Sequence, residues 1–149
     1  MRSASILVAL LLAGCSRTGE NVIGTVSRAM VFRGVAVVTT SGAYQRSDGR
    51  VVVGAFVRNA SADTVVVASC AAIPTLSLER RTGSAWEVAD AMYCLAVNTA
   101  ALVLAPGETV NATVSWPDPG AGRFRLGLYV TTKTNDNSAT IHSPEFAVQ

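Results

Sequence analysis

The chain has 149 residues, of which half are hydrophobic and only 15% are charged, and its formal net charge is +2 at pH 7. This composition excludes an intrinsically disordered chain, which would combine low hydrophobicity with high charge. The near balance of acidic and basic residues also argues against a nucleic-acid partner, because nucleic-acid-binding domains concentrate Lys and Arg.

The first fourteen residues have the layout of a secretory signal peptide. Met1 and Arg2 form a short basic start, which precedes an apolar run over residues 6–13. Secretory signals combine such a start with about 7–15 apolar residues and a small-residue cleavage site. The run is much shorter than the ~20 apolar residues of a transmembrane helix. The beginning of the chain therefore predicts export rather than a membrane span.

A four-residue motif closes this segment. Leu12-Ala13-Gly14-Cys15 resembles the lipobox of bacterial lipoproteins, in which a Leu and two small residues precede a cysteine. The resemblance covers residues 1–15. It implies cleavage before Cys15, a diacylglyceryl group on the Cys15 thiol and an acyl chain such as palmitate on the new amine.

The implied lipid anchor would be firm. Each buried CH₂ of an acyl chain contributes about 0.8 kcal/mol to membrane binding, so several chains on Cys15 hold a protein at a bilayer. Ser16 stands after the cysteine where Asp would retain a lipoprotein in the inner membrane. In a Gram-negative cell this implies the outer membrane, on its periplasmic or surface face. The alternative is an ordinary signal peptide cut nearby, with Cys15 left unmodified.

The remaining chain divides into a tether and one domain. Residues 15–21 comprise the lipidated cysteine and a short polar stretch that is typical of a flexible linker. Residues 22–149 have the size of a single domain. Within it, residues 22–33 fit neither helix nor strand and are interpreted as a weak strand or a docked arm. We expect the residues before Val22 to be detached from the domain.

From Gly34 onward the patterns are those of β structure. Residues 35–41 and 50–58 are rich in Val and Thr, which favours strands. Between these two runs, the triplet 47–49 has the composition of a hairpin turn. The clearest alternation of apolar and polar residues runs over 109–116 and 123–130, which predicts two strands with one buried face each. The side chains expected to share one core are Val110, Val114, Trp116, Phe124, Leu126 and Leu128.

The whole pattern predicts an all-β fold. About seven to nine short strands, turn signals every 8–12 residues and no amphipathic helix are typical of an antiparallel immunoglobulin-like β-sandwich. Several motifs also resemble small bacterial immunoglobulin-like modules. They are an "N-x-S" corner at 57–61, an "L-x-P-G-E" turn at 104–109, and a "T-x-W … G-x-Y-x-L" pair at 114–116 and 122–126, with Phe124 in place of Tyr.

Among named families, the bacterial proteinase inhibitor of the intracellular type is similar in this arrangement. The similarity spans residues 51–130 and implies the fold, with protease inhibition as one expected activity. The lipid anchor and the cysteine pair are departures from that family.

The three cysteines have different expected fates. If Cys15 carries lipid, Cys70 and Cys94 remain as a pair, and an oxidising compartment favours their joining. The Cα atoms should then lie within about 7 Å of each other. Closing this loop would stabilise the domain by about 3–4 kcal/mol in the chain-entropy model. The alternative is two buried free thiols.

Catalytic and metal-binding patterns are not evident in the sequence. His142 is the only histidine, whereas a zinc site needs three or four converging ligands and a serine hydrolase needs a base beside its nucleophile. Asp90, Asp118 and Glu108 lie at predicted turns, where acidic residues commonly cap the backbone. Calcium-loop spacing is also absent among Asp48, Asp63, Asp118 and Asp136. We therefore predict no catalytic residue, no metal and no cofactor.

Aromatic side chains offer another route to binding. Trp116 is in phase with the predicted core, whereas Trp86, Tyr93 and Tyr44 could form a partly exposed patch. The first hypothesis is a lipid-anchored, non-enzymatic envelope module that binds a protein partner or has a structural role. The second is a proteinase inhibitor that uses a loop such as 71–75 or 133–138. The third is an enzyme of unrecognised type.

Overall fold

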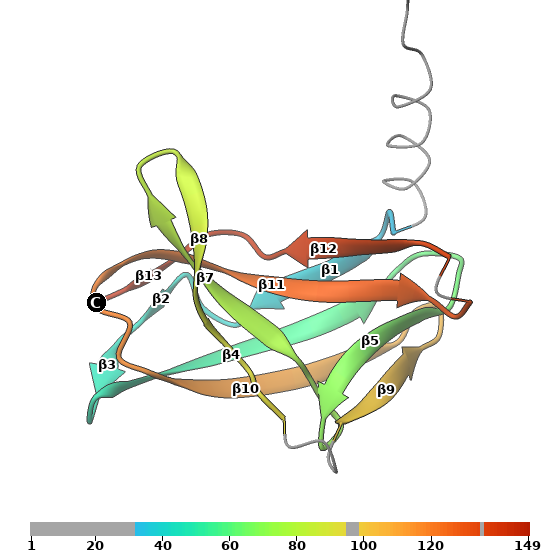
Figure 1. Cartoon of the computed structure of the whole chain (residues 1–149), viewed down its shortest axis with the longest axis horizontal. Helices are drawn as coiled ribbons and strands as arrows, with labels where there is room; N and C mark the ends of the chain where they lie inside the picture. The colour runs from blue at the N-terminus through green and yellow to red at the C-terminus, as the bar shows by residue number, and fades with distance from the viewer. Residues whose placement is uncertain (1–31, 95–98, 135) are drawn as a thin grey trace, which may run out of the picture.

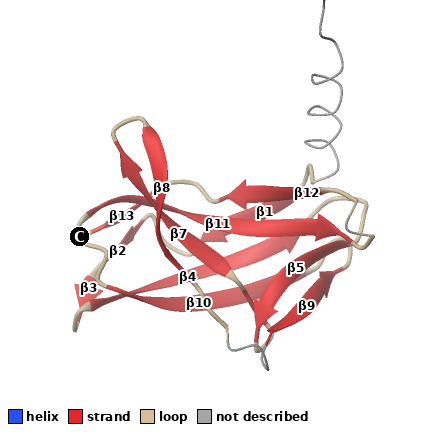
Figure 2. Ribbon diagram, viewed as in Figure 1, coloured by secondary structure: helices blue, strands red, loops and turns tan. Residues whose placement is uncertain are grey.

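The computed structural model describes residues 32–94, 99–134 and 136–149, which contain thirteen strands and no helix (Figures 1 and 2). The signal peptide, the lipobox with Cys15, the tether and residues 22–31 of the expected arm lie outside the described residues. In chain order the strands are β1 (Val35–Thr39), β2 (Ala43–Tyr44), β3 (Arg46–Ser47), β4 (Arg50–Asn59), β5 (Val65–Cys70), β6 (Ile73–Pro74), β7 (Leu76–Thr82), β8 (Ala85–Ala91), β9 (Thr99–Leu104), β10 (Thr109–Pro117), β11 (Gly122–Thr132), β12 (Ser138–His142) and β13 (Phe146–Val148).

The smaller sheet, sheet A, has the order β1–β4–β10, with β3 paired to the start of β4. All of its pairings are antiparallel, and β4 is the central strand. The β3–β4 hairpin turns at Asp48 and Gly49, whose φ angles of 53° and 69° are both positive. Two consecutive positive φ angles are the geometry of a type I′ turn, which matches the twist of the flanking strands. The turn expected at residues 47–49 is therefore confirmed.

The larger sheet, sheet B, is built around β11. Phe124 lies opposite Arg80 of β7 on one side and opposite Phe146 of β13 on the other. Farther along β11, β12 continues the β13 side and β5 continues the β7 side. Strand β8 extends the sheet from β7, and β9 and β6 pair with β5. The single parallel pairing among the described strands joins β13 to β2.

The core lies between the two sheets and follows the period-2 alternation. On β11 the inward side chains are fully buried, and the residues between them face outward. The expected common core is confirmed for Val114, Trp116, Phe124, Leu126 and Leu128, whereas Val110 is half-buried and packs against its margin. Phe32 is also buried in this core, so the described end of the expected arm is docked.

An all-β sandwich is thus the architecture, as the alternation predicted. The thirteen strands exceed the expected seven to nine because β2, β3 and β6 are two-residue pairings and β13 has only three residues. Such short pairings are too brief to show a periodic pattern and depend on the neighbouring strand.

Candidate functional site

One face of sheet B carries several exposed apolar side chains. Because Leu126 and Leu128 of β11 point into the core, Tyr129 points outward, and 53% of its surface is exposed. Val103 of β9 is 50% exposed and pairs with Val66 of β5 on the same face. These residues define what we call the outer face of sheet B. Exposed apolar surface of this kind is typical of interaction sites.

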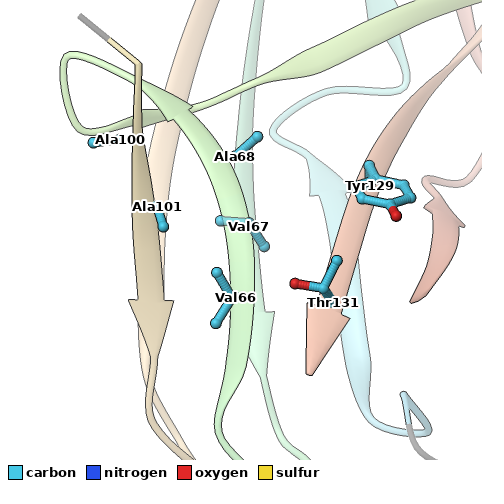
Figure 3. Close-up of a pocket in the computed structure, with 7 residues that line it drawn as sticks. All are labelled: Val66, Val67, Ala68, Ala100, Ala101, Tyr129 and Thr131. Carbon is cyan, nitrogen blue, oxygen red and sulfur yellow. The ribbon is translucent and has the colours of Figure 1, made fainter. Parts of the chain in front are cut away.

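A shallow hollow of about 390 Å³ lies on this face beside Tyr129 (Figure 3). Its walls come from three strands, with Ala100 and Ala101 on β9, Val66 on β5 and Tyr129 on β11. Because Ala100 and Ala101 have small side chains, the space between β9 and the Tyr129 ring stays open. The Tyr129 hydroxyl has no hydrogen-bond partner within the described part of the chain, so it is free to bond a ligand.

A second hollow, of about 290 Å³, lies on the other side of Tyr129, where Val88 and Thr140 contribute to its walls. Gly127 belongs to its lining and is buried against two neighbours. A Cβ atom at this position would lie 2.5 Å from Ser77 Oγ and 2.8 Å from a Glu79 carboxylate oxygen. Glycine at position 127 therefore lets the Ser77 and Glu79 side chains lie over β11, and it leaves this part of the face hollow.

An ion network lies along one side of the second hollow. The Glu79 carboxylate accepts a 2.7 Å hydrogen bond from Arg125 Nε and lies 3.3 Å from His142 Nε2. The Arg125 guanidinium stacks over the Trp86 ring, 4.4 Å from its centroid. Because Glu79 is buried and Arg125 is partly buried, removing one partner of this network should cost more than breaking an exposed ion pair.

The network also explains where the single histidine lies. His142 is in β12, and its imidazole is half-exposed and directed to a carboxylate. Among the described residues its side chain makes no hydrogen bond to a Ser, Thr or Cys that it could activate as a nucleophile. Sequence reasoning missed Glu79 and Arg125, because adjacent strands bring them together from positions 46 residues apart.

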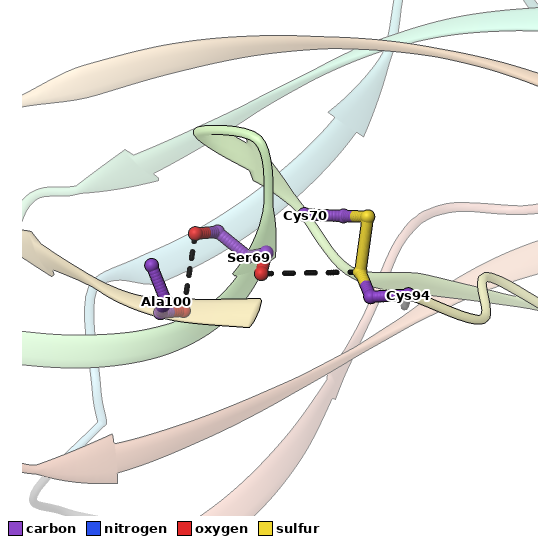
Figure 4. Close-up of a disulfide and its surroundings, with 4 residues drawn as sticks. All are labelled: Ser69, Cys70, Cys94 and Ala100. Atoms are coloured by element: carbon purple, nitrogen blue, oxygen red, sulfur yellow. Dashed lines mark hydrogen bonds between the residues drawn. A yellow bond between two sulfur atoms is a disulfide. The ribbon is translucent and has the colours of Figure 1, made fainter. Parts of the chain in front are cut away.

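The predicted disulfide joins Cys70 and Cys94 (Figure 4). Their Cα atoms are 5.7 Å apart, within the expected limit, and they are separated by 24 residues in the chain. Beside the bridge, the buried Ser69 hydroxyl donates a 3.1 Å hydrogen bond to the Ala100 carbonyl (Figure 4). The bridge therefore ties the segment after β8 to the end of β5.

The turn that follows Cys70 has a strained backbone. Ala71 and Ala72 have φ angles of 49° and 67°, in the left-handed region that alanine rarely adopts. The two alanines connect β5 to β6, and Ile73 beyond them is exposed. Backbone strain of this kind costs of order 1–3 kcal/mol per residue and persists only where the surroundings impose it. Here Ala71 and Ala72 form the two-residue loop between the paired Cys70 and Ile73, and such a loop imposes positive φ angles.

The three acidic residues considered as catalytic candidates each bond the nearby backbone. Asp90 accepts from Ala91 N–H at 2.7 Å, and Asp118 accepts from Gly120 N–H at 2.8 Å. Glu108 likewise accepts a 2.8 Å bond from the backbone of the preceding turn. The described residues contain no group of three or more potential metal ligands.

The three aromatic residues of the hypothetical patch have separate surroundings. Tyr44 packs edge-on against Phe146, and its hydroxyl donates to the Gly54 carbonyl at 2.8 Å. Trp86 covers a guanidinium on the outer face of sheet B. Tyr93 is 90% exposed and lies next to the disulfide. The three residues therefore form no single patch, and Trp86 is the one of them that lies on the outer face of sheet B.

The described segments form no helix with the length and apolar character needed to cross a bilayer. Comparison with known proteins finds no family model that matches the chain and no curated protein that matches it. Its function therefore has to be inferred from its own residues.

Proposed function

We propose that this protein is a lipid-anchored component of the bacterial cell envelope whose β-sandwich binds a protein partner without catalysing a reaction. The observation that carries the binding role is Tyr129, exposed between two hollows on the outer face of sheet B. Tyrosine is enriched in interface cores because it combines a large apolar ring with a polar hydroxyl. The lipobox supports anchoring through Cys15, with the outer membrane of a Gram-negative cell as the proposed location.

A non-enzymatic role is supported by the way the polar groups are used. His142 pairs with Glu79, and the acidic candidates bond the nearby backbone: Asp118 does so in the expected turn, whereas Asp90 lies in β8 and not at the turn that the sequence predicted. An active site instead brings a nucleophile, a base and an oxyanion-stabilising group together around one cleft. The outer face offers apolar surface with a polar margin, which suits binding.

Lipidation can be tested by growing cells that express the full chain with a palmitate analogue. The wild-type protein should incorporate the label and partition with membranes, whereas Cys15→Ala should do neither. The matched control is the double variant Cys70→Ser with Cys94→Ser, which keeps the lipobox and should be labelled. Labelling of Cys15→Ala at the wild-type level would refute the anchor.

The binding face can be tested by crosslinking the anchored protein in its native cells. The control residue is Val52, which is 53% exposed on the outward side of sheet A, nearly matching the 50% of Val103 on sheet B. A crosslinked partner should be retained by Val52→Asp and lost from Val103→Asp and from Tyr129→Ser. Equal capture by all three variants would show that the partner binds elsewhere.

Protease inhibition is a second candidate, favoured by one observation. The Ala71–Ala72 turn is strained, exposed and held by a disulfide, which are properties of a rigid loop that could occupy a protease cleft. The test is to incubate the detergent-purified protein with a panel of envelope and secreted proteases. Inhibition that is lost in Ile73→Asp would support this role, and a panel left fully active would exclude it for those proteases.

A further inference from the structure

A slot of about 400 Å³ lies along one edge of β10, and it adjoins the second hollow at Ala91, which lines both. One wall consists of residues 113–117 of β10, and the other consists of residues 90–93, which end β8 and lead to the disulfide. Within the described strands, β10 pairs with β4 alone. The slot therefore follows a strand edge that has backbone groups to offer.

The direction of those backbone groups follows from the β4–β10 hydrogen bonds. At one end of the pairing Asp118 N–H donates to Gly49 O at 2.8 Å, and at the other Asn59 N–H donates to Glu108 O at 2.9 Å. Hydrogen-bonded positions alternate along antiparallel strands. Thr113 lies an odd number of residues from both ends, so its N–H and C=O point away from β4 and toward the slot.

The residue paired with Thr113 supports this direction. Gly54 turns its carbonyl to the opposite side, where it accepts the Thr40 N–H at 2.9 Å. Farther along the same edge, the Ser115 carbonyl is already occupied by a 2.8 Å bond from Arg50. No hydrogen bond reaches the main chain of Thr113 in residues 32–94, 99–134 and 136–149. One donor and one acceptor are thus available in the slot.

Trp116 supplies a second available donor. Its residue is only 2% exposed and lines the slot. Its indole Nε1 is buried without a hydrogen-bond partner, the one such side-chain atom in the described part of the chain. Buried polar groups are almost always paired, so this N–H is an unsatisfied donor on a residue that lines the slot.

Asp90 supplies a free acceptor on the opposite wall. A β-bulge at this point makes Leu78 pair with Asp90 while Glu79 pairs with Val88, which changes the phase of β8. Asp90 thereby lies opposite a core residue and reaches the slot instead of the outer face. Its Oδ1 accepts from Ala91 N–H, and no cationic group lies within 4.0 Å of its carboxylate among the described ion pairs.

We propose that this slot binds an extended segment of a partner polypeptide that carries a lysine or arginine, added to β10 as a further strand. A strand added to β10 pairs with Thr113 through its main chain, and its inward side chains, such as a threonine hydroxyl, can present an acceptor to Trp116 Nε1. A basic side chain complements the unpaired Asp90. This site adjoins the outer face of sheet B at Ala91 but uses different recognising groups, and it goes beyond the proposed function.

The test uses NMR on the full chain purified in detergent, because its two tryptophans report separately. The probe is the peptide acetyl-Thr-Val-Lys-Val-Thr-amide, and Trp86→Phe assigns the two indole signals. Saturable displacement of the Trp116 indole N–H signal, with the Trp86 signal unchanged, is the expected result. The same peptide N-methylated at alternate amides, or with Glu in place of Lys, should bind about tenfold more weakly or not at all.

Two protein variants test the recognising groups. Asp90→Asn should weaken binding about tenfold, and Thr113→Pro should abolish pairing because proline has no N–H. Thr109→Pro is the matched control, since it lies on the same edge four residues from Thr113, beyond a five-residue strand centred there, and should bind like the wild type. If the peptide leaves the Trp116 signal unchanged at millimolar concentration, the slot holds solvent only and the proposal fails. Unaltered binding by both Asp90→Asn and Thr113→Pro would also overturn it.

Discussion

The side-chain amide of Asn59 donates a 3.0 Å hydrogen bond to the backbone carbonyl of Leu104, linking the end of β4 to the end of β9. Asn59 is fully buried, and it donates a second bond to the Asp63 carbonyl while its own side-chain oxygen accepts from Ser61. One side chain thus closes the corner after β4 and binds that corner to the turn before β10.

Asn59→Ala should therefore destabilise the protein by about 2–3 kcal/mol, because several buried polar groups would lose their partner. Urea unfolding followed by tryptophan fluorescence measures this difference. Asn111→Ala is the matched control, since this asparagine is exposed on β10 and its loss should cost less than about 0.5 kcal/mol. Equal effects of the two substitutions would show that the corner contributes nothing specific.

The Glu79–Arg125 pair should be worth more than an exposed pair of similar geometry. Glu79→Gln should lower the free energy of unfolding by about 2–3 kcal/mol, since it leaves the Arg125 guanidinium without its carboxylate in a largely buried place. Glu145→Gln breaks the exposed 3.0 Å pair with Arg81 and should cost at most about 1 kcal/mol. The two variants should be compared in the same urea titration, and a larger loss for Glu145→Gln would contradict the burial argument.

Removing the disulfide should be costly. The double substitution Cys70→Ala with Cys94→Ala should lower the free energy of unfolding by about 3–4 kcal/mol, mainly by freeing the unfolded chain. Thermal unfolding with and without a reductant checks this. The wild type should shift to lower temperature when reduced, and the double variant should be insensitive to the reductant.

Glycine should relieve the backbone strain in the turn after Cys70. Ala72→Gly should stabilise the protein by about 0.5–1 kcal/mol, because glycine adopts a positive φ at no steric cost. The control is Ala68→Gly in β5, where the backbone is extended and glycine should destabilise the strand. Denaturant midpoints measure both changes, and a destabilising Ala72→Gly would mean that the left-handed backbone carries little strain.

Much of the fold was predictable because its signals are local. The alternation over 109–116 and 123–130 identified β10, β11 and their buried faces, since side chains on a strand point to opposite sides with period 2. The "N-x-S" corner and the "L-x-P-G-E" turn were also readable, and the structure shows that Asn59 joins them. Neither motif reveals this contact by itself.

The candidate sites were much less predictable. Tyr129 looked like any outward residue of a strand, and only the order of strands placed it between two hollows. Glu79 and Arg125 meet because β7 and β11 pair in one register. Asp90 reaches the slot because a bulge changes the phase of β8, and no pattern in residues 85–91 announces that bulge.

By itself, the sequence determined the β character of the chain, the inward faces of its longest strands and the pairing of Cys70 with Cys94, and it supplies the whole basis for expecting a lipid on Cys15. Those inferences depend on local periodicity, short motifs and cysteine number. Only the tertiary structure decided which strand edge stays free, which outward residues gather on one face and why Trp116 Nε1 has no partner in the described chain. Such features depend on register and strand order, which join residues that are distant in the chain.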